Sequence, residues 1–420
     1  MALRSTPPVS LPRPAARSLA LAAQGLLVPE SSASLGELLE RHGLVRTLGG
    51  VDAYLALRAR RPETTAAEVD AALSRGEIRV LPAARGCIYL VPASLATLCL
   101  RVAETLTRGR DEKEHAKAGI RPGEVDALGE LVLATLAETG PLATDALRRA
   151  LPAGSVRSLG EAGKKIGVSS PLPAALRRLE FAGRLERTIE SGRLDSERYL
   201  WRLPVGERDA TLEPRSDPAA LHLRLAALYF RAAGVGTVAG FADWCGCTKR
   251  EALAVVPELK MIEVEVEGER EMCFVPAEYE RWLGAPPDSQ GGLSLLPFED
   301  NAFALHGGPA FFTEPRHFEL VVPSWGSAKP KPLGETAHLA YRAIVADGRL
   351  AGFWELDPER GEVETALLEE LSAASRRQLG AAAAAVRDLL TRQLGNARSY
   401  SLDTENDLAR RVAALRALGH

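Results

Sequence analysis

The sequence predicts a folded protein of the mainly α with β (α+β) class. Of its 420 residues, 46% are hydrophobic and 25% are charged, which is the balance of a globular protein. Alanine, leucine and arginine are abundant, and these residues favour helices. Apolar residues recur at spacings of three and four, and short alternating runs lie between glycine- and proline-rich turns. These patterns indicate helical modules that are each closed by a few short strands.

One unit, residues 123–205, shows this organisation most clearly. Apolar residues from Val125 to Leu136 fall on one helix face, and Gly140-Pro141 ends that helix. A second short helix is expected through Leu151, and a third between residues 169 and 183. Two alternating runs then predict strands at 184–189 and 199–203, joined by a turn at Ser191-Gly192. Helix–helix–helix–hairpin is the winged-helix plan, a variant of helix-turn-helix.

The same plan is expected on both sides of this unit. Residues 206–285 predict a further winged-helix domain, and residues 15–122 predict a looser, winged-helix-like one after a flexible tail at 1–14. Residues 286–360 predict a small β-barrel-like domain with strands at 318–322, 340–346 and 350–355. Residues 361–420 predict C-terminal helices at 367–392 and 402–418. The expected architecture is therefore tandem winged-helix domains, a β-rich domain and terminal helices.

Composition limits the classes of partner. The net charge of −3 is unusual for a nucleic-acid-binding protein, but residues 157–202 hold ten Lys and Arg against six Asp and Glu. No uncharged apolar run is long enough to cross a membrane, and the N-terminus lacks a signal-peptide pattern. We therefore expect a cytoplasmic monomer without a membrane partner. The five cysteines, including Cys245 and Cys247, lack metal-ligand spacing, so neither a metal nor a cofactor is expected.

Basic residues near the predicted third helices are candidate contacts to double-stranded DNA. Those of the clearest module lie in the third helix, the loop before it and the wing: Lys164, Lys165, Arg177, Arg178, Arg184, Arg187 and Arg193. Lys249 and Arg250 occupy the matching start of the next module's third helix. Such residues usually contact phosphates, which fixes the position of the protein without reading base sequence. The alternative is a solvated helix face.

Six segments, in order along nearly the whole chain, resemble the AlkZ/YcaQ winged-helix family of DNA-repair glycosylases. Arg85 to Ala93 reads R-G-C-I-Y-L-V-P-A against the family's R-G-T-L-H-L-V-P-A, and Gly240 to Ala252 is similar to its D-F-A-x-W-S-G-L-x-x-x-E-A. The other similar segments are residues 16–26, 54–60, 296–300 and 345–354. The resemblance implies three tandem winged helices and a small β-barrel wrapped around duplex DNA, and an activity that removes alkylated or crosslinked bases.

The resemblance also implies a catalytic Gln-x-Gln or Gln-x-Asp just ahead of the helix at 54–60. An alignment without gaps places these two positions at Arg46 and Leu48. Neither replaces glutamine, because arginine has no hydrogen-bond acceptor and leucine is inert. A gapped alignment offers Asp52 to activate water and Tyr54 to orient it, although Asp52 is also a plausible helix N-cap. Tyr89 stands where the family often has histidine; it could contact DNA, or it could belong to the core.

Three hypotheses follow. The first is a DNA-binding protein that keeps the glycosylase scaffold, recognises damaged or distorted duplex, and lacks the usual glutamine pair. The second is an active, monofunctional DNA glycosylase that hydrolyses the N-glycosidic bond of an alkylated base by means of Asp52 and extrudes the target nucleotide. The third is a transcription regulator with a small-molecule site in the β-rich domain.

Overall fold

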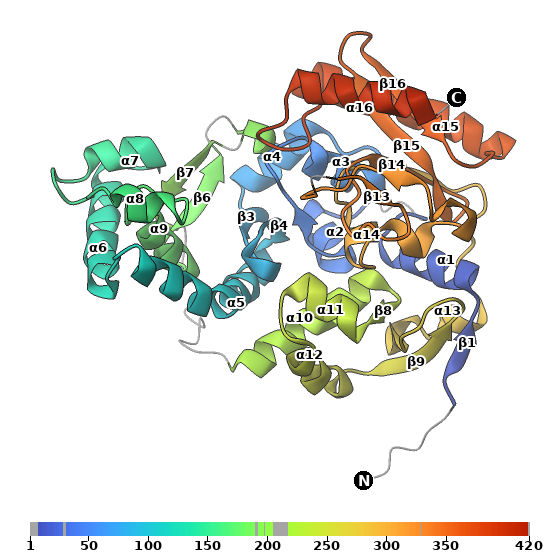
Figure 1. Ribbon diagram of the computed structural model, residues 1–420, viewed down its shortest axis with the longest axis horizontal. Helices are drawn as coiled ribbons and strands as arrows, with labels where there is room; N and C mark the ends of the chain where they lie inside the picture. Colours follow the sequence, from blue (N-terminus) through green and yellow to red (C-terminus); the bar gives the residue numbers. More distant parts are fainter. Residues whose placement is uncertain are drawn as a thin grey trace.

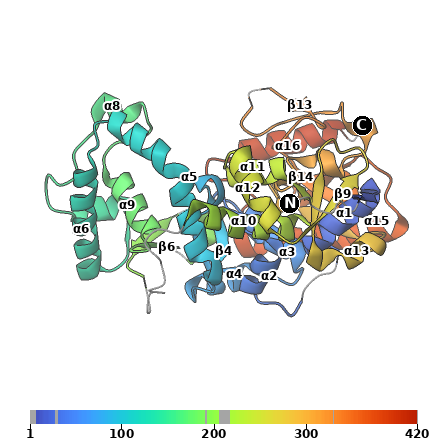
Figure 2. The same cartoon turned by 90° about the horizontal axis from the view of Figure 1, so that it is seen from below.

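The computed structural model describes residues 7–27, 31–189, 192–196, 198–204, 217–327 and 329–418. The protein is mixed α/β, with many helices and small sheets that are almost entirely antiparallel. Figures 1 and 2 show a lobe containing α6 to α9 that stands to one side of a larger body and is joined to it through α5. None of the described helices combines the length and the apolar character that crossing a membrane requires.

The N-terminal module begins earlier than the sequence predicts. Residues 9–14 are not a tail, because β1 (Val9–Leu11) pairs in parallel with β9 and buries Leu11, and α1 follows at once. Residues 1–6 of the predicted tail lie outside the described residues. A capping box of Ser34 and Glu37 opens α2, and the sheet order is β2-β4-β3. The elements are α1 (Arg13–Ala23), α2 (Leu35–His42), β2 (Val45–Arg46), α3 (Asp52–Arg60), α4 (Ala66–Ser74), β3 (Ile78–Pro82), β4 (Ile88–Pro92) and α5 (Ala96–Lys117).

The projecting lobe contains a hydrophobic core of its own. Leucine and valine side chains of α6 pack on those of α9, and Trp201 of β7 closes the cluster. The sheet order is β5-β7-β6, and Ser191 of the predicted hairpin turn lies outside the described residues. The elements are α6 (Pro122–Thr139), β5 (Leu142–Ala143), α7 (Thr144–Ala150), α8 (Gly160–Lys164), α9 (Leu172–Phe181), β6 (Glu186–Ile189) and β7 (Tyr199–Arg202).

The next module has a similar order of helices and strands and lies within the larger body. Thr248 and Glu251 form a capping box at the start of α12, and the sheet order is β1-β9-β10-β8. An aromatic group including Tyr229, Phe230 and Phe241 fills the module's core. The elements are α10 (Pro218–Ala233), β8 (Gly236–Thr237), α11 (Val238–Cys245), α12 (Lys249–Val255), β9 (Met261–Val266), β10 (Cys273–Pro276) and α13 (Arg281–Gly284).

The β-rich region is an open sheet and not the expected barrel. Its strand order is β11-β14-β15-β16, and the two edge strands do not pair with each other. The helices α15 and α16 pack over this sheet. The predicted strand at 318–322 shortens to β12, and the helix predicted from residue 367 begins at Ala373, after β16 ends. The elements are β11 (Leu293–Leu296), α14 (Asn301–Ala304), β12 (Val321–Val322), β13 (Lys331–Pro332), β14 (Arg342–Ala346), β15 (Arg349–Asp357), β16 (Glu362–Leu367), α15 (Ala373–Asp388) and α16 (Glu405–Leu418).

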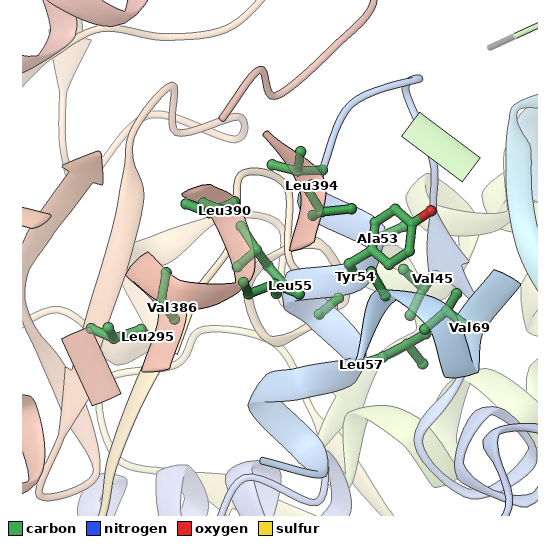
Figure 3. Close-up of a cluster of buried hydrophobic side chains, with 14 of the residues drawn as sticks. Val45, Ala53, Tyr54, Leu55, Leu57, Val69, Leu295, Val386, Leu390 and Leu394 are labelled. Atoms are coloured by element: carbon green, nitrogen blue, oxygen red, sulfur yellow. The ribbon is translucent and has the colours of Figure 1, made fainter. Parts of the chain in front are cut away.

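One hydrophobic cluster fixes α3 between the two ends of the chain. Leu55 and Leu57 of α3 belong to the same buried cluster as Leu295 of β11, Leu390 and Leu394. Figure 3 shows these side chains converging from the N-terminal module and the C-terminal helices. Residues just before and at the start of α3 are therefore held where three parts of the chain meet.

Candidate functional site

The segment from residue 46 to residue 51 runs between strand β4 and the loop ahead of α16. Arg46 lies opposite Tyr89 in the β2–β4 ladder. The Leu48 carbonyl accepts a hydrogen bond from the Ser401 N–H at 3.0 Å, and Gly49 forms a β-bridge with Tyr400. This close approach leaves no room for a side chain at Gly50, whose Cβ would lie 2.2 Å from the Arg398 carbonyl oxygen.

Arg46 is paired with a carboxylate that the sequence did not single out. Its Nη1 atom lies 2.8 Å from Oε2 of Glu299, and Nδ1 of His338 lies 3.0 Å from the same oxygen. The Glu299 side chain is only 5% exposed, whereas that of His338 is 40% exposed. Glu299 has a φ of +56°, a left-handed conformation that costs free energy for a residue other than glycine.

Glu299 and His338 could not be linked to Arg46 by sequence spacing. Glu299 lies within the segment 296–300 that resembles the family, which is the one signal that could have drawn attention to it. His338 lies outside the six similar segments, so no sequence signal marks it. An arginine side chain can only donate hydrogen bonds, whereas the Glu299 carboxylate can only accept them. Arg46 and His338 therefore both donate to Glu299.

Asp52 is the first residue of α3, and it does not cap that helix. The N-cap position is Val51, and no side chain of the described residues caps the helix there, so the N-cap interpretation of Asp52 is wrong. Oδ1 of Asp52 lies 2.9 Å from Nε and 2.8 Å from Nη2 of Arg342. Burial raises the pKa of Asp52 to about 6, although the Arg342 charge opposes that rise.

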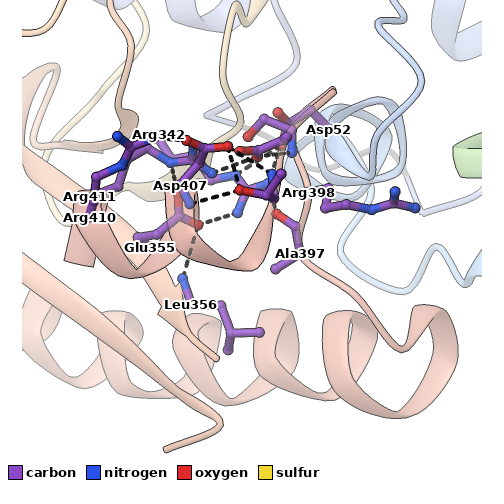
Figure 4. A network of polar contacts seen from close by, with 12 residues as sticks. Asp52, Arg342, Glu355, Leu356, Ala397, Arg398, Asp407, Arg410 and Arg411 are labelled. Carbon is purple, nitrogen blue, oxygen red and sulfur yellow. Dashed lines mark hydrogen bonds and ion pairs between the residues drawn. The ribbon is translucent and has the colours of Figure 1, made fainter. Parts of the chain in front are cut away.

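Asp52 is the end of a buried chain of alternating charges (Figure 4). Arg342 pairs with Glu355 and donates to the Ala397 carbonyl at 2.8 Å. Glu355 also pairs with Arg411 at 2.7 Å, and Arg411 pairs at 2.7 Å with Asp403, whose side chain is fully buried. This network joins α3, β14, β15 and α16. The Asp52 carboxylate is therefore part of a structural ion network, and the Arg342 charge limits the rise in its pKa.

Tyr54 points away from Asp52. It is 1% exposed, its hydroxyl donates to Oδ1 of Asp70 at 2.6 Å and accepts from the Leu194 N–H at 2.8 Å, and burial raises its pKa. Figure 3 shows the ring within the hydrophobic cluster. The structure thus places Asp52 and Tyr54 in different polar contacts. Tyr89 is likewise buried, at 5% exposure, and burial raises its pKa.

Most of the nominated basic residues pair with carboxylates of the chain itself. Arg178 and Arg184 pair with carboxylates of α6, whereas Arg177 pairs with Asp111 of α5. The remaining pairs are Lys164 with Glu161, Arg187 with Glu180, Arg193 with Asp195, and Lys249 with Glu271. Lys165 and Arg250 form no ion pair with any residue in the described ranges.

Exposure separates these cations into two groups. Lys164, Arg178 and Lys249 have side chains that are more than half exposed. Arg187 is 17% exposed and its guanidinium lies 5.0 Å from the centre of the Trp201 ring, and Arg193 also donates to the Leu394 carbonyl. Arg187 and Arg193 therefore stabilise the lobe and its attachment to the body, whereas Lys164, Arg178 and Lys249 keep exposed side chains.

Comparison with known proteins identifies relatives of this chain. A family model described as DNA glycosylase AlkZ-like matches residues 50–389. Among solved structures, the Streptomyces sahachiroi DNA glycosylase AlkZ is similar, with a TM-score of 0.69 and 19% sequence identity over 93% of this chain and 99% of that chain. At this identity the structural similarity shows the fold. A search of curated protein sequences found no match.

Proposed function

The chain belongs to the AlkZ-like DNA glycosylase family, and from this premise we propose that it binds double-stranded DNA at damaged or distorted sites without glutamine-based base removal. The observation that carries this proposal is the pairing of Arg46 with Glu299 at 2.8 Å. Breaking an N-glycosidic bond builds positive charge on the sugar, which needs an acceptor or an anion nearby. The Glu299 carboxylate is at this site, but its charge is balanced by Arg46, which is a permanent cation, and Leu48 supplies no polar group.

The exposed cations support the DNA-binding part of this proposal. Lys164, Arg178 and Lys249 extend into solvent from two modules, and their carboxylate partners are themselves mostly at the surface. Ion pairs of this kind contribute little to stability, so a phosphate can replace the carboxylate at small cost. With a net charge of −3, binding is expected to be moderate in strength and to weaken steeply as salt is added.

Two measurements test the proposal together. Electrophoretic mobility shift with duplex DNA should show complexes that dissociate as the salt concentration rises, and more complex with a mismatched or alkylated duplex than with a paired one. Incubation with N7-alkylated duplex should release no free base above the level without protein. Base release by the wild type would overturn the non-catalytic part, and absence of any complex in dilute buffer would overturn DNA binding.

Asp52 gives a second candidate function, which is base hydrolysis. Two observations favour it: Oδ2 of Asp52 accepts no hydrogen bond from the described residues, and burial raises the pKa of this carboxyl to about 6. The residue also lines, with Arg46 and Glu299, a cavity of about 10 Å³, which is close to the space that one water molecule needs. Base release that Asp52→Asn abolishes, with folding intact by circular dichroism, would select this function.

A further inference from the structure

A cleft lined by aromatic rings opens between the β-rich region and α16. It has a volume of about 280 Å³, and its walls include Phe298, Trp325 and Tyr400. The Trp325 and Tyr400 ring centroids are 4.5 Å apart with an interplanar angle of 64°, and Trp325 meets Phe298 at 5.1 Å and 66°. These edge-to-face contacts hold the rings in a fixed arrangement. Phe298 is buried, whereas Trp325 and Tyr400 are half-exposed.

Polar groups of the cleft are available to a ligand. Within the described part of the chain, neither the Trp325 indole N–H nor the Tyr400 hydroxyl has a hydrogen-bond partner. Arg410 also lines the cleft, and its side chain is 78% exposed and pairs with Asp407. The remaining charged residues that line the cleft are already in ion pairs, and these are Asp407, Arg342, Glu355 and Arg411. The cleft therefore combines aromatic surface, one donor, one hydroxyl that can donate or accept, and the exposed Arg410 cation. A ligand with a flat aromatic ring, polar edges and an attached anion would satisfy all four.

The cleft adjoins the two positions where the family resemblance places catalysis. Tyr400 forms the β-bridge with Gly49, next to Leu48. Phe298 directly precedes Glu299, the partner of Arg46. The main-chain N–H of Trp325 donates to the main-chain oxygen of His338 at 2.8 Å, and the His338 ring contacts Glu299. A group bound in the cleft would thus lie beside the segment from 46 to 49.

We propose that this cleft holds a single unstacked nucleobase of a distorted DNA duplex. The inference rests on the proposed function, because it names how DNA distortion is recognised. Aromatic side chains stack with every base, so they suit a site that senses loss of base pairing rather than sequence. Extrusion costs least where pairing is already broken, which makes capture in the cleft selective for damaged or mismatched sites. Arg410 is placed to meet the phosphate that accompanies the extruded base.

Photochemical crosslinking of the full-length wild-type protein tests the location directly. The probe is a duplex with one bulged 5-iodouracil, irradiated in the complex, followed by mass spectrometry of the crosslinked peptides. Crosslinks at Trp325 or Tyr400 are expected. Crosslinks confined to residues outside the cleft would overturn the proposal, and this result does not depend on any variant folding.

Affinity measurements by fluorescence anisotropy test the energetics. Trp325→Leu should reduce the affinity for a bulged duplex by about tenfold, the loss of one base–aromatic stack, and leave the affinity for the fully paired duplex unchanged. Trp282→Leu is the matched control. Trp282 is half-buried, its ring stacks on that of Tyr279 with the centroids 4.5 Å apart, and it does not line the cleft. Equal wild-type affinity for both duplexes would overturn this inference alone, whereas no binding to either would overturn the proposed function with it.

Discussion

Replacing Arg342 by methionine should destabilise the protein strongly, and more so at alkaline than at acidic pH. Arg342 is 1% exposed and lies between the carboxylates of Asp52 and Glu355. The variant keeps the volume of the side chain and removes its charge. Glu355 retains Arg411 as a partner at 2.7 Å, whereas Asp52 loses the only ion-pair partner that the described residues give it.

The size of the effect follows from the state of Asp52. Leaving one buried charge unpaired costs about 3–5 kcal/mol, which is the loss expected at pH 8. In the wild type, burial raises the pKa of Asp52 from 3.8 to about 6. Because this pKa is higher in the folded than in the unfolded protein, protonation of Asp52 adds to the free energy of unfolding. This contribution, about 3 kcal/mol, is fully present below pH 4 and is lost as the pH rises through 6. Without Arg342 this pKa rises further, so at pH 5 the carboxyl of the variant is neutral and the variant's deficit shrinks.

Urea titration monitored by tryptophan fluorescence at pH 5 and pH 8 measures this difference. Trp354 reports on the region, since the Arg342 guanidinium lies 5.2 Å from its ring centre. Arg387→Met is the matched control, because Arg387 and its partner Glu362 are both exposed and such a pair contributes at most about 1 kcal/mol. The same loss of unfolding free energy for Arg342→Met at both pH values would show that Asp52 does not carry the unpaired charge.

Three further results are expected. Gly50→Ala should lower the free energy of unfolding by about 1–3 kcal/mol, because its Cβ would lie 2.2 Å from neighbouring backbone. The control is Gly123→Ala, whose Cβ would meet nothing within 4 Å and which should leave the thermal midpoint nearly unchanged. Equal thermal midpoints for the two variants would contradict the clash at Gly50. Arg46→Gln combined with Leu48→Gln restores the family's two polar positions and should produce base release from N7-alkylated duplex, measured by chromatography; no release would mean that more than this pair separates the site from catalysis. Arg178→Ala should weaken binding to all duplexes alike and reduce the slope of log affinity against log salt by about 1, and an unchanged slope would exclude Arg178 from the interface.

Local signals account for the parts of the fold that could be predicted from the sequence. The apolar spacing from Val125 to Leu136 corresponds to α6, and Thr248 and Glu251, three residues apart, form the capping box that opens α12. Both features depend on residues within a few positions of one another. By contrast, β1 is three residues long and forms only because β9, more than 250 residues later, provides its partner. The open sheet has the same origin, since local sequence does not specify which edge strands remain unpaired.

The candidate site was harder to predict because its contacts are between distant residues. Asp52 was selected for its carboxylate, but its partner Arg342 lies 290 positions away. Tyr54 was assigned to the same site for its hydroxyl group. In the structure this hydroxyl forms hydrogen bonds with the Asp70 carboxylate and the Leu194 N–H. Periodicity could not assign Tyr54 to one face, because the residues of α3 from Asp52 to Leu57 are all buried.

The pairing of Arg46 with Glu299 shows why substitutions at this site have to be considered together. A guanidinium that is 25% exposed needs a counter-charge, and Glu299 supplies it from a left-handed backbone conformation. Reverting Arg46 to glutamine alone removes the cation and leaves a nearly buried carboxylate with only His338 beside it. A lack of base release by that variant would then reflect an unpaired Glu299 as well as the new side chain. Adding Glu299→Gln keeps the site neutral, so the comparison of variants with and without that change separates the chemistry of the glutamines from the electrostatics of the missing ion pair.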